Sequence, residues 1–265
     1  MPAPDQLFDP RLARLRRARA GASESEAFFL HHRAAADLLE RLDLVARDFA
    51  TALDLSAGPW LADGLAARGI AVIRADEASL PSAAGPFDLA VSLGLLDTVN
   101  DLPGALALLR RALKPDGLFL AAFAGAGSLS RLRRAMRAAE EAEGKGAAPR
   151  IHPQIDVRAA GDLLTRAGFA LPVVDRDVIE VRYPDLRKLV ADLRTMGATN
   201  LLAGQAGGFI GRRGYAAAIA DFAGPAEERF EIVHLSGWAP GPGQPQPAPR
   251  GSGSASLADA LRPRG

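Results

Sequence analysis

The sequence predicts an α/β domain with a doubly wound, mostly parallel sheet and helices on both faces of that sheet. Short apolar runs alternate with amphipathic segments along the first half of the chain, and the runs end in turns that contain glycine or proline. Parallel neighbours need crossover connections, which helices usually supply, so this alternation favours a parallel sheet. With 265 residues, of which 48% are hydrophobic, the chain is long enough to bury a full-sized core.

Residues 1–48 are expected to form a helical cap on this domain. Residues 1–19 are basic and contain no apolar signal core, which favours a solvated helix on the domain edge over a targeting segment. Ser23 and Glu26 have the spacing of a capping box, and apolar residues then recur at helical intervals. A helix is therefore predicted to run to about Arg47.

Four strands with connecting helices are predicted from residue 49 to residue 124. The apolar runs that read as buried parallel strands are 50–55, 70–74, 87–95 and 118–124. Helices are expected at 61–68, where Pro59 precedes the first turn, and at 101–113. A turn is predicted at 114–117, because proline and glycine stand there in favoured places.

The pattern is less regular in the C-terminal half of the chain, but the domain is expected to extend over residues 49–238 with a helical insertion around 185–222. The segments predicted as helices are 128–143, 157–167 and 185–196, and those predicted as extended are 171–174, 178–183 and 229–238. Residues 239–265 are rich in proline, glycine and serine and have little apolar surface to offset the entropy of ordering, which predicts a disordered tail.

Composition excludes several classes of function. The formal net charge is +1, so no global field draws the protein to nucleic acid or anionic lipid. The absence of cysteine excludes disulfides, thiolate catalysis and cysteine metal sites, and the four histidines are too scattered to predict a zinc site. No apolar run approaches the ~20 residues that cross a bilayer, so a cytoplasmic protein without a transmembrane segment is expected.

The turn after the first strand is the expected ligand-binding loop, because ligands of doubly wound sheets lie at the carboxyl ends of the strands. It reads Asp54-Leu55-Ser56-Ala57-Gly58-Pro59-Trp60. Only Gly58 lets the backbone approach a ligand without an intervening Cβ, whereas a dinucleotide fingerprint needs three glycines at set spacing. NAD and FAD are therefore disfavoured.

Sequence blocks in this order resemble class I S-adenosylmethionine-dependent methyltransferases. They are Ala52-Leu53-Asp54-Leu55, Ala75-Asp76-Glu77-Ala78-Ser79-Leu80-Pro81, Phe87-Asp88-Leu89, Val99-Asn100-Asp101-Leu102-Pro103 and Leu113-Lys114-Pro115-Asp116-Gly117. Within that superfamily the chain looks most similar to the complex I assembly factor 5 family, a neighbour of the malonyl-carrier-protein methyltransferases. The blocks that carry this closer likeness are Arg166–Phe169, Val181–Leu186, Asp192–Asn200 and Phe230–Trp238.

The resemblance implies S-adenosylmethionine as cofactor and a reaction that either transfers its methyl group or hydroxylates a protein arginine. The implied protein substrate is a subunit of respiratory complex I. The residues that fall on cofactor-binding positions of the family are Asp54, Ser56, Gly58, Trp60, Asp76 and Glu77.

Two of these positions depart from the family pattern. The family loop resembles Asp-x-Gly-x-Gly-x-Gly, and here Ser56 and Trp60 occupy the places of the first and third glycines. The Trp60 indole is expected either to occupy the cofactor pocket itself or to turn away and pack under the helix that follows.

The segment after the second strand is also shorter than in the family. Asp76 lies 18 residues after Gly58, near the spacing at which a carboxylate meets ribose hydroxyls, yet its neighbours resemble the family's later, adenine-lining segment. Both interpretations leave one strand–helix unit missing before the strand at Phe87, so the sheet is expected to be a strand short.

After the strand at Phe87 the family resembles His-Trp-Val-Asn-Asp, where this chain has Asp97-Thr98-Val99-Asn100-Asp101. The imidazole and the indole of that motif are lost. Asp97 is either a replacement acid/base group or a solvated loop carboxylate. These departures leave a second functional hypothesis open, that of a catalytically inactive module that binds or assembles other proteins and has lost the cofactor.

Overall fold

A computed structural model describes residues 6–21, 25–80, 85–144, 148–204, 209–242 and 244–245. Its centre is a six-stranded sheet in the order β2-β1-β3-β4-β6-β5, in which β1 to β4 are parallel and β6 is antiparallel to both of its neighbours. The strands are β1 Thr51–Asp54, β2 Ala71–Arg74, β3 Phe87–Leu93, β4 Leu113–Ala124, β5 Ala170–Tyr183 and β6 Ala226–Trp238. The predicted doubly wound, mostly parallel sheet is therefore confirmed.

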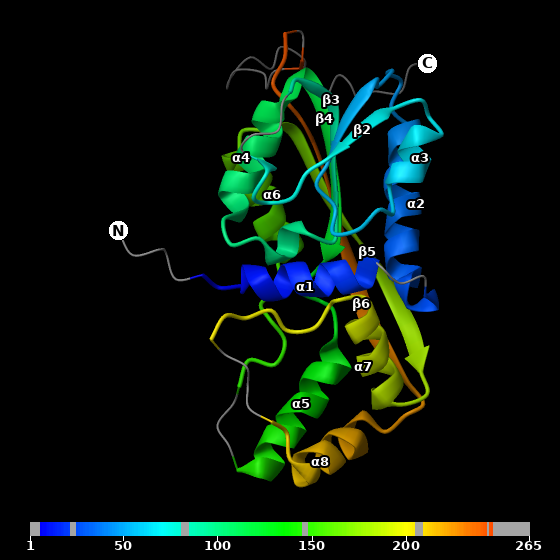
Figure 1. Ribbon diagram of the computed structural model, residues 1–265, viewed down its shortest axis with the longest axis vertical. Coiled ribbons are helices and arrows are strands. Elements are labelled where there is room, and N and C mark those ends of the chain that lie inside the picture. The colour runs from blue at the N-terminus through cyan, green and yellow to red at the C-terminus, as the bar shows by residue number, and fades with distance from the viewer. Residues whose placement is uncertain are drawn as a thin grey trace, which may run out of the picture.

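Helices cover both faces of this sheet and form a second layer below it (Figure 1). Their bounds are α1 Pro10–Gly21, α2 Phe29–Asp43, α3 Ala62–Ala66, α4 Leu102–Ala112, α5 Ser130–Glu143, α6 Val157–Arg166, α7 Leu186–Thr195 and α8 Arg212–Phe222, with short 3-10 turns η1 Glu26–Phe28 and η3 Leu96–Thr98. Among the described residues, no helix is long and apolar enough to span a bilayer.

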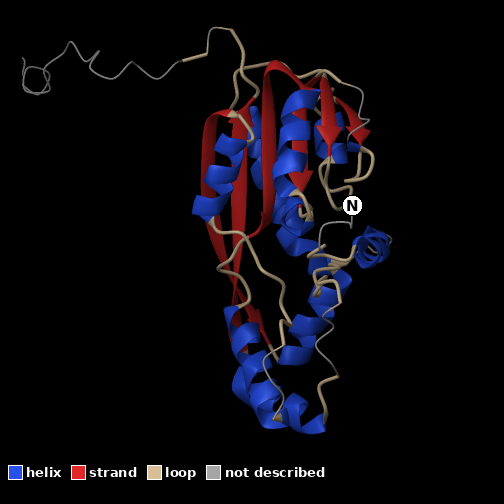
Figure 2. Ribbon diagram, turned by 90° about the vertical axis from the view of Figure 1, so that its left-hand side faces the viewer, coloured by secondary structure: helices blue, strands red, loops and turns tan. Residues whose placement is uncertain are grey.

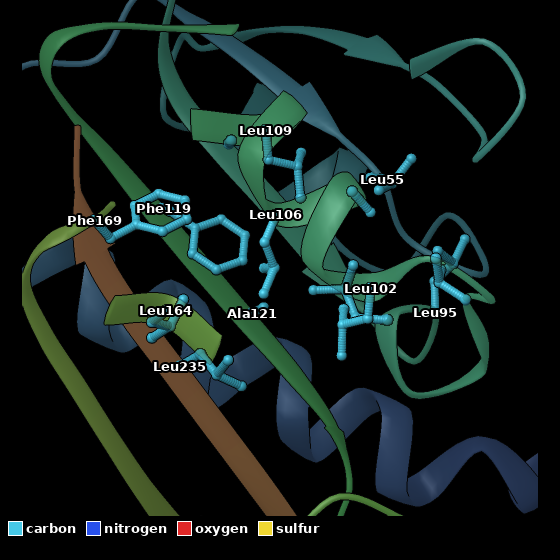
Figure 3. Close-up of a cluster of buried hydrophobic side chains, with 14 of the residues drawn as sticks. Leu55, Leu95, Leu102, Leu106, Leu109, Phe119, Ala121, Leu164, Phe169 and Leu235 are labelled. Carbon is cyan, nitrogen blue, oxygen red and sulfur yellow. The ribbon is translucent and has the colours of Figure 1, made fainter. Parts of the chain in front are cut away.

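Two cores lie on opposite faces of the sheet. On one face α4 and α6 contribute Leu106, Leu109 and Leu164, and the rings of Phe119 and Phe169 stack with their centroids 5.0 Å apart (Figure 3). On the other face α2 and α3 bury their leucines against β1, β3 and β4. Strands buried on both faces explain why β3 and most of β4 read as continuous apolar runs in the sequence.

A third core holds the helical part together, at the bottom of the view in Figure 1 and of Figure 2. There α5, α7 and α8 pack on the lower half of the long β5–β6 pair, around Leu189 and Phe222, which are fully buried. Helix α1 lies crosswise between this part and the sheet (Figure 1). The two parts are thus joined by strands that run through both.

Side-chain caps set several helix starts. Asp101, Asp156 and Asp185 accept hydrogen bonds from backbone N–H groups three residues ahead, at 2.8 to 2.9 Å. The predicted cap Ser23 lies outside the described residues. In the structure the Ser25 hydroxyl accepts from the backbone of Ala27 instead, η1 precedes α2, and α2 ends at Asp43.

The predicted turn at 114–117 is a bulge inside β4. Phe87 pairs with Leu113 and Leu89 with Leu118, so the intervening residues of β4 bulge out of the ladder. Pro115 has no N–H to donate, and Asp116 adopts a positive φ of 65°, which together explain the interruption. The two extended runs predicted at 171–174 and 178–183 form one strand, β5, because β6 pairs with it along its whole length.

The connection from β2 to β3 contains no further strand–helix unit in its described residues, 75–80 and 85–86. Strand β2 therefore forms an edge of the sheet, and Ile73 is 54% exposed there. The expected shortening of the fold is consistent with this six-stranded order.

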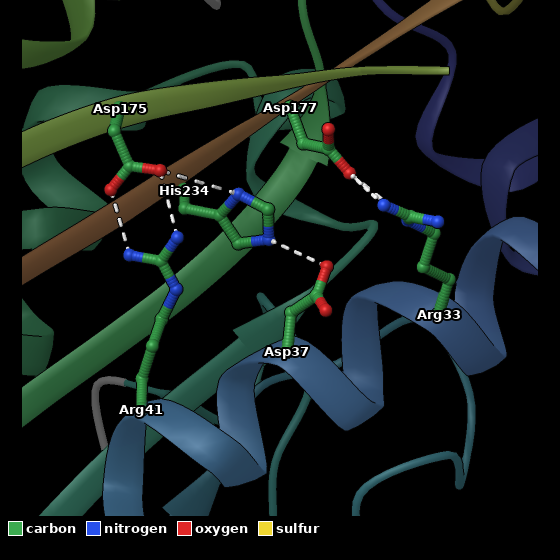
Figure 4. Close-up of polar contacts among 6 residues, drawn as sticks. All are labelled: Arg33, Asp37, Arg41, Asp175, Asp177 and His234. Carbon is green, nitrogen blue, oxygen red and sulfur yellow. Dashed lines mark hydrogen bonds and ion pairs between the residues drawn. The ribbon is translucent and has the colours of Figure 1, made fainter. Parts of the chain in front are cut away.

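Ion pairs fasten α2 to β5 across one face of the sheet (Figure 4). Arg41 binds the Asp175 carboxylate with two hydrogen bonds, at 2.7 and 2.8 Å, and Arg33 binds one oxygen of Asp177. The His234 ring is 1% exposed and lies between Asp175 and Asp37, at 3.8 and 3.7 Å. Burial, the largest effect, lowers the pKa of His234, so the ring is neutral at pH 7.

We expect Asp175→Asn to lower the free energy of unfolding at pH 7 by about 0.5 kcal/mol, since the pair is half exposed and screened by solvent. The hydrogen bond from Arg41 lowers the pKa of Asp175, so this stabilisation is present above the carboxyl's ordinary pKa and is lost as the pH falls through the lowered value. Urea denaturation at pH 7 and pH 2.5 measures it. The control Asp177→Asn should have a smaller effect, and an equal loss at both pH values would contradict the assignment.

Candidate active site

The turn after β1 is held against the end of β3 by hydrogen bonds. Leu93 donates its backbone N–H to the Ser56 hydroxyl at 2.9 Å, and the Ser92 hydroxyl donates to the Leu55 carbonyl at 2.7 Å. The Ser56 side chain is buried and faces the protein. Sequence reasoning placed Ser56 among the cofactor-binding residues, and the structure gives its hydroxyl an internal partner.

Asp54, the last residue of β1, carries a fully buried carboxylate with Arg74 beside it. The residue is 0% exposed, and neither carboxylate oxygen accepts a hydrogen bond from the described residues. The Arg74 guanidinium forms an ion pair with it at 3.3 Å, in a geometry too poor for a hydrogen bond. Burial raises the pKa of Asp54, and Ser56 and Arg74 oppose that rise. Such a carboxylate is suited to a cationic ligand group.

The indole of Trp60 lies directly over Gly58. A Cβ added to Gly58 would lie only 2.6 Å from Cη2 of that ring, so glycine is required here by the tryptophan itself. The indole also stacks on the His31 imidazole, with centroids 4.1 Å apart, and contacts the Phe28 ring at 5.7 Å. The indole therefore lies against the Gly58 backbone, as in the first expected orientation, and also packs on the core that α2 and α3 form, as in the second.

His31 contributes an imidazole that sequence reasoning did not place at the site. It projects from α2, and a Cβ added to Gly94, just after β3, would lie 3.7 Å from its ring. Burial and the neighbouring His32 lower the pKa of His31 to about 4, and its Nδ1 makes no hydrogen bond to any described residue. An imidazole from α2 and an indole from the loop after β1 therefore stack on each other beside this loop.

Asp97 lies in η3, at the end of β3, and is not a solvated loop carboxylate. Its Oδ1 is buried and accepts no hydrogen bond from the described residues. Burial raises the pKa of Asp97 to about 6, against the opposing effects of its own backbone N–H and of Arg17. A carboxyl that titrates so close to neutrality can take or give a proton under ordinary conditions.

Arg17, on α1, connects Asp97 with the two acidic residues that follow β2. It donates to the Thr98 hydroxyl at 3.2 Å. Burial lowers its pKa, while the negative charges of Glu77, Asp97 and Asp76 raise it, so all three carboxylates lie within electrostatic reach of one guanidinium. Helix α1 is therefore more than the expected solvated helix, and nothing in the basic pattern singled out Arg17.

Asp76 is exposed, and its carboxylate accepts hydrogen bonds from both the backbone N–H and the hydroxyl of Ser79, at 2.8 and 2.7 Å. These bonds lower its pKa. The predicted residues thus form two groups, one around β1 with Asp54, Ser56, Gly58 and Trp60, and one around Arg17 with Asp76, Glu77 and Asp97. Within the described ranges, no cluster of three or more histidine, aspartate or glutamate side chains could hold a metal ion.

Residues 34–121 match the family model described as a methyltransferase domain. The chain is 35% identical over 174 residues to the mitochondrial arginine-hydroxylase NDUFAF5 of Danio rerio, a match that covers 63% of this chain and 54% of the relative. It is 33% identical over 181 residues to the malonyl-[acyl-carrier protein] O-methyltransferase of Laribacter hongkongensis, covering 66% and 59%.

Among solved structures, a phosphoethanolamine N-methyltransferase 2 of Haemonchus contortus, in complex with phosphomonomethylethanolamine and S-adenosylhomocysteine, gives a TM-score of 0.46 at 15% identity, covering 78% of this chain and 52% of that one. The chain spans a little over half the length of the two relatives named above. The sequence resemblance to class I methyltransferases and to the complex I assembly factor 5 family is confirmed by the family model and the relatives.

We expect the Asp97 carboxyl to titrate with a midpoint near pH 6, and we expect Arg17→Gln to raise that midpoint because it removes the nearby positive charge. Carbon-13 NMR of aspartate-labelled protein measures both values, with Asp97→Asn identifying the resonance. Arg19→Gln lies on the same helix, and Arg19 is not among the charges that shift the pKa of Asp97, so this variant is the control and should leave the midpoint unchanged. A midpoint near 4 in the unmodified protein would contradict the burial argument.

Proposed function

We propose that the chain, which belongs to the class I S-adenosylmethionine-dependent methyltransferase superfamily, binds S-adenosylmethionine and transfers its methyl group to an acceptor. The observation that carries the proposal is the buried carboxylate of Asp54 at the end of β1, whose oxygens accept no hydrogen bond from the described residues and which lies within the segment that matches the methyltransferase domain. The carboxyl ends of parallel strands are where such folds bind their ligands.

The charges of the residues at this edge of the sheet are complementary to those of the cofactor. The Asp54 carboxylate oxygens lack a hydrogen-bond donor among the described residues, and the Arg74 ion pair, at 3.3 Å, involves one of them, so the carboxylate suits a ligand with a positive amino or sulfonium group. Asp76 and Glu77 offer carboxylates to the adenosine part, either to the ribose hydroxyls or to the adenine. Space beside Gly58 is the limiting feature, because the Trp60 indole covers it and has to rotate before the methionine part can approach.

When bound, S-adenosylmethionine supplies an electrophilic methyl group on its sulfonium. The chain's own contribution is to position the acceptor and to exclude water, which is how enzymes promote such transfers. Helix α1 lies over this edge through Arg17, and the stacked rings of Trp60 and His31 cover its other side. Asp97, with its pKa near 6, is the candidate to accept a proton from the acceptor.

The acceptor is proposed by analogy with the relatives. The NDUFAF5 proteins are named as arginine hydroxylases. One proposed target is therefore a protein arginine, such as one on a subunit of respiratory complex I, and hydroxylation of that arginine is the alternative reaction. The name of the other relatives gives methylation of a carrier-bound malonyl group. Both point to a protein-borne substrate, which we propose is met in the cytoplasm.

The helical segments around the sheet are proposed to shape access to this site. In this division residues 1–48 form a cap, residues 49–238 form the α/β domain, and residues 185–222 are a helical insertion within it. The tail proposed for residues 239–265 lies mostly outside the described residues.

A second candidate function is a catalytically inactive binding or assembly module. One observation favours it: the indole of Trp60 occupies the space over Gly58 and is held there by two further aromatic rings, from His31 and Phe28. The two candidates differ in whether the cofactor still binds.

We expect S-adenosylhomocysteine to bind the purified protein with one-to-one stoichiometry in calorimetry, and we expect Trp60→Gly to strengthen that binding about tenfold, about 1.4 kcal/mol, by clearing the space beside Gly58. Asp54→Asn should weaken it, because a neutral amide no longer balances a cationic group. Trp238→Phe, at the far end of β6, is the matched control and should leave binding unchanged. Absence of heat from both the unmodified protein and Trp60→Gly, with normal thermal unfolding, would reject the enzyme and leave the inactive module.

A further inference from the structure

A cavity of about 930 Å³ opens beyond the carboxyl end of β4, where β5 and β6 run past it. It is lined by the loop after β4, the first turn of α6 and residues of β5 and β6, and no residue of the loop after β1 is part of its wall. Since β3 and β4 separate β1 from β6, the two sites are about three strand spacings, ~15 Å, apart. The cavity has the volume of a small-molecule site.

Three arginines face this cavity, one from each of three elements: Arg158 from α6, Arg176 from β5 and Arg229 from β6. Arg176 forms an ion pair with Glu231 at 3.0 Å. Arg158 and Arg229 have no acidic partner among the described residues, and the Nε of Arg229 is buried without a hydrogen bond. A buried guanidinium N–H without an acceptor is costly, and an oxyanion bound by the same guanidinium would offset part of that cost.

The acidic residues of the wall do not cancel this charge. Glu231 is 3% exposed, and its carboxylate is already engaged by Arg176 and by the backbone N–H of Gly127 at 3.2 Å. The Asp156 carboxylate caps α6 by accepting from the backbone of Ala159. Glu231 thus neutralises one of the three arginines, Arg176, and the two remaining arginines outnumber the one remaining carboxylate, Asp156, so the cavity retains a positive charge.

The wall is also fixed in place before any ligand arrives. The loop after β4 is pinned to β6 by backbone hydrogen bonds from Gly125 to Glu231 and from Leu129 to Arg229, both 2.8 Å. A Cβ on Gly125 or on Gly127 would lie 2.6 or 2.5 Å from the Glu231 carboxylate, so these glycines allow the carboxylate to sit under the loop. Such a preorganised wall loses little entropy on binding.

We propose that this cavity binds the oxyanion of a small ligand, a phosphate or a carboxylate, through the guanidinium groups of Arg229 and Arg158. Arginine suits this task because its planar fork donates two parallel hydrogen bonds to an oxyanion. Arg176, held by Glu231, borders the site and adds positive potential. A cationic group would meet like charge there, so the cavity selects acidic ligands. The proposal does not depend on the cofactor, since none of its residues belongs to the loop after β1.

Titration of the full chain with inorganic phosphate and, separately, with succinate at constant ionic strength tests the proposal, with the arginine Nε–Hε signals followed by NMR. We expect the chemical shift of the Arg229 Nε–Hε signal to change along a saturable binding curve for at least one of the two anions. Saturation by phosphate identifies a phosphate ligand and saturation by succinate a carboxylate ligand. A shift that rises linearly for both anions, without saturation, would overturn the site.

Variants separate the site from general anion effects. Arg158→Gln should weaken the saturable binding at least tenfold, the loss expected for one charged hydrogen-bonding group. Because Arg158 is exposed and its side chain forms no hydrogen bond or ion pair with another described residue, this variant should fold even where Arg229→Gln does not. Arg166→Gln, exposed at the other end of α6, is the control, and equal weakening by Arg166→Gln and Arg158→Gln would also overturn the site. Addition of saturating S-adenosylhomocysteine should leave the saturable anion binding in place, which keeps this test separate from that of the cofactor.

Discussion

Strand β6 is the element on which the rest of the structure depends, because it is the partner of β4 in the sheet and of β5 along its whole length. Its upper half completes the sheet that carries the loop after β1. Its lower half carries Glu228, fully buried, whose carboxylate accepts the backbone N–H groups of Arg131 and Leu132 and so fixes the start of α5. One strand thereby holds the α/β layer and the helical layer in a fixed relation.

The candidate active site combines groups that are individually unfavourable in a protein interior. Both carboxylate oxygens of Asp54 and the Oδ1 of Asp97 are buried and accept no hydrogen bond from the described residues, and the buried Nδ1 of His31 has no partner among them either. Each has a pKa displaced by burial, toward the neutral form in every case. Such displaced groups gather where a protein binds a ligand or moves a proton, and the two neighbouring strand ends bring them together here.

The position of the Trp60 indole decides whether a ligand can reach the loop after β1. In the family pattern the loop after β1 leaves its backbone open by means of glycines, whereas here an indole covers the one glycine that remains and is itself stacked on an imidazole. The covered loop and the open basic cavity beyond β4 lie on the same edge of the sheet but are built from different strands. The structure therefore separates a site that has to open from one whose wall is already formed.

The sequence by itself determined the fold class, the order of most elements and the loop after β1, because apolar periodicity and turn residues act over a few neighbouring positions. It also determined that Asp54 ends a buried strand and that the connection from β2 to β3 is short. Only the tertiary structure decided that Trp60 lies on Gly58, that His31 from α2 joins it, that Arg17 lies among Glu77, Asp76 and Asp97, and that Arg158, Arg176 and Arg229 face one cavity. These contacts join residues far apart in the chain, and their burial, which displaces the pKa values and isolates the charges, depends on packing that no local pattern encodes.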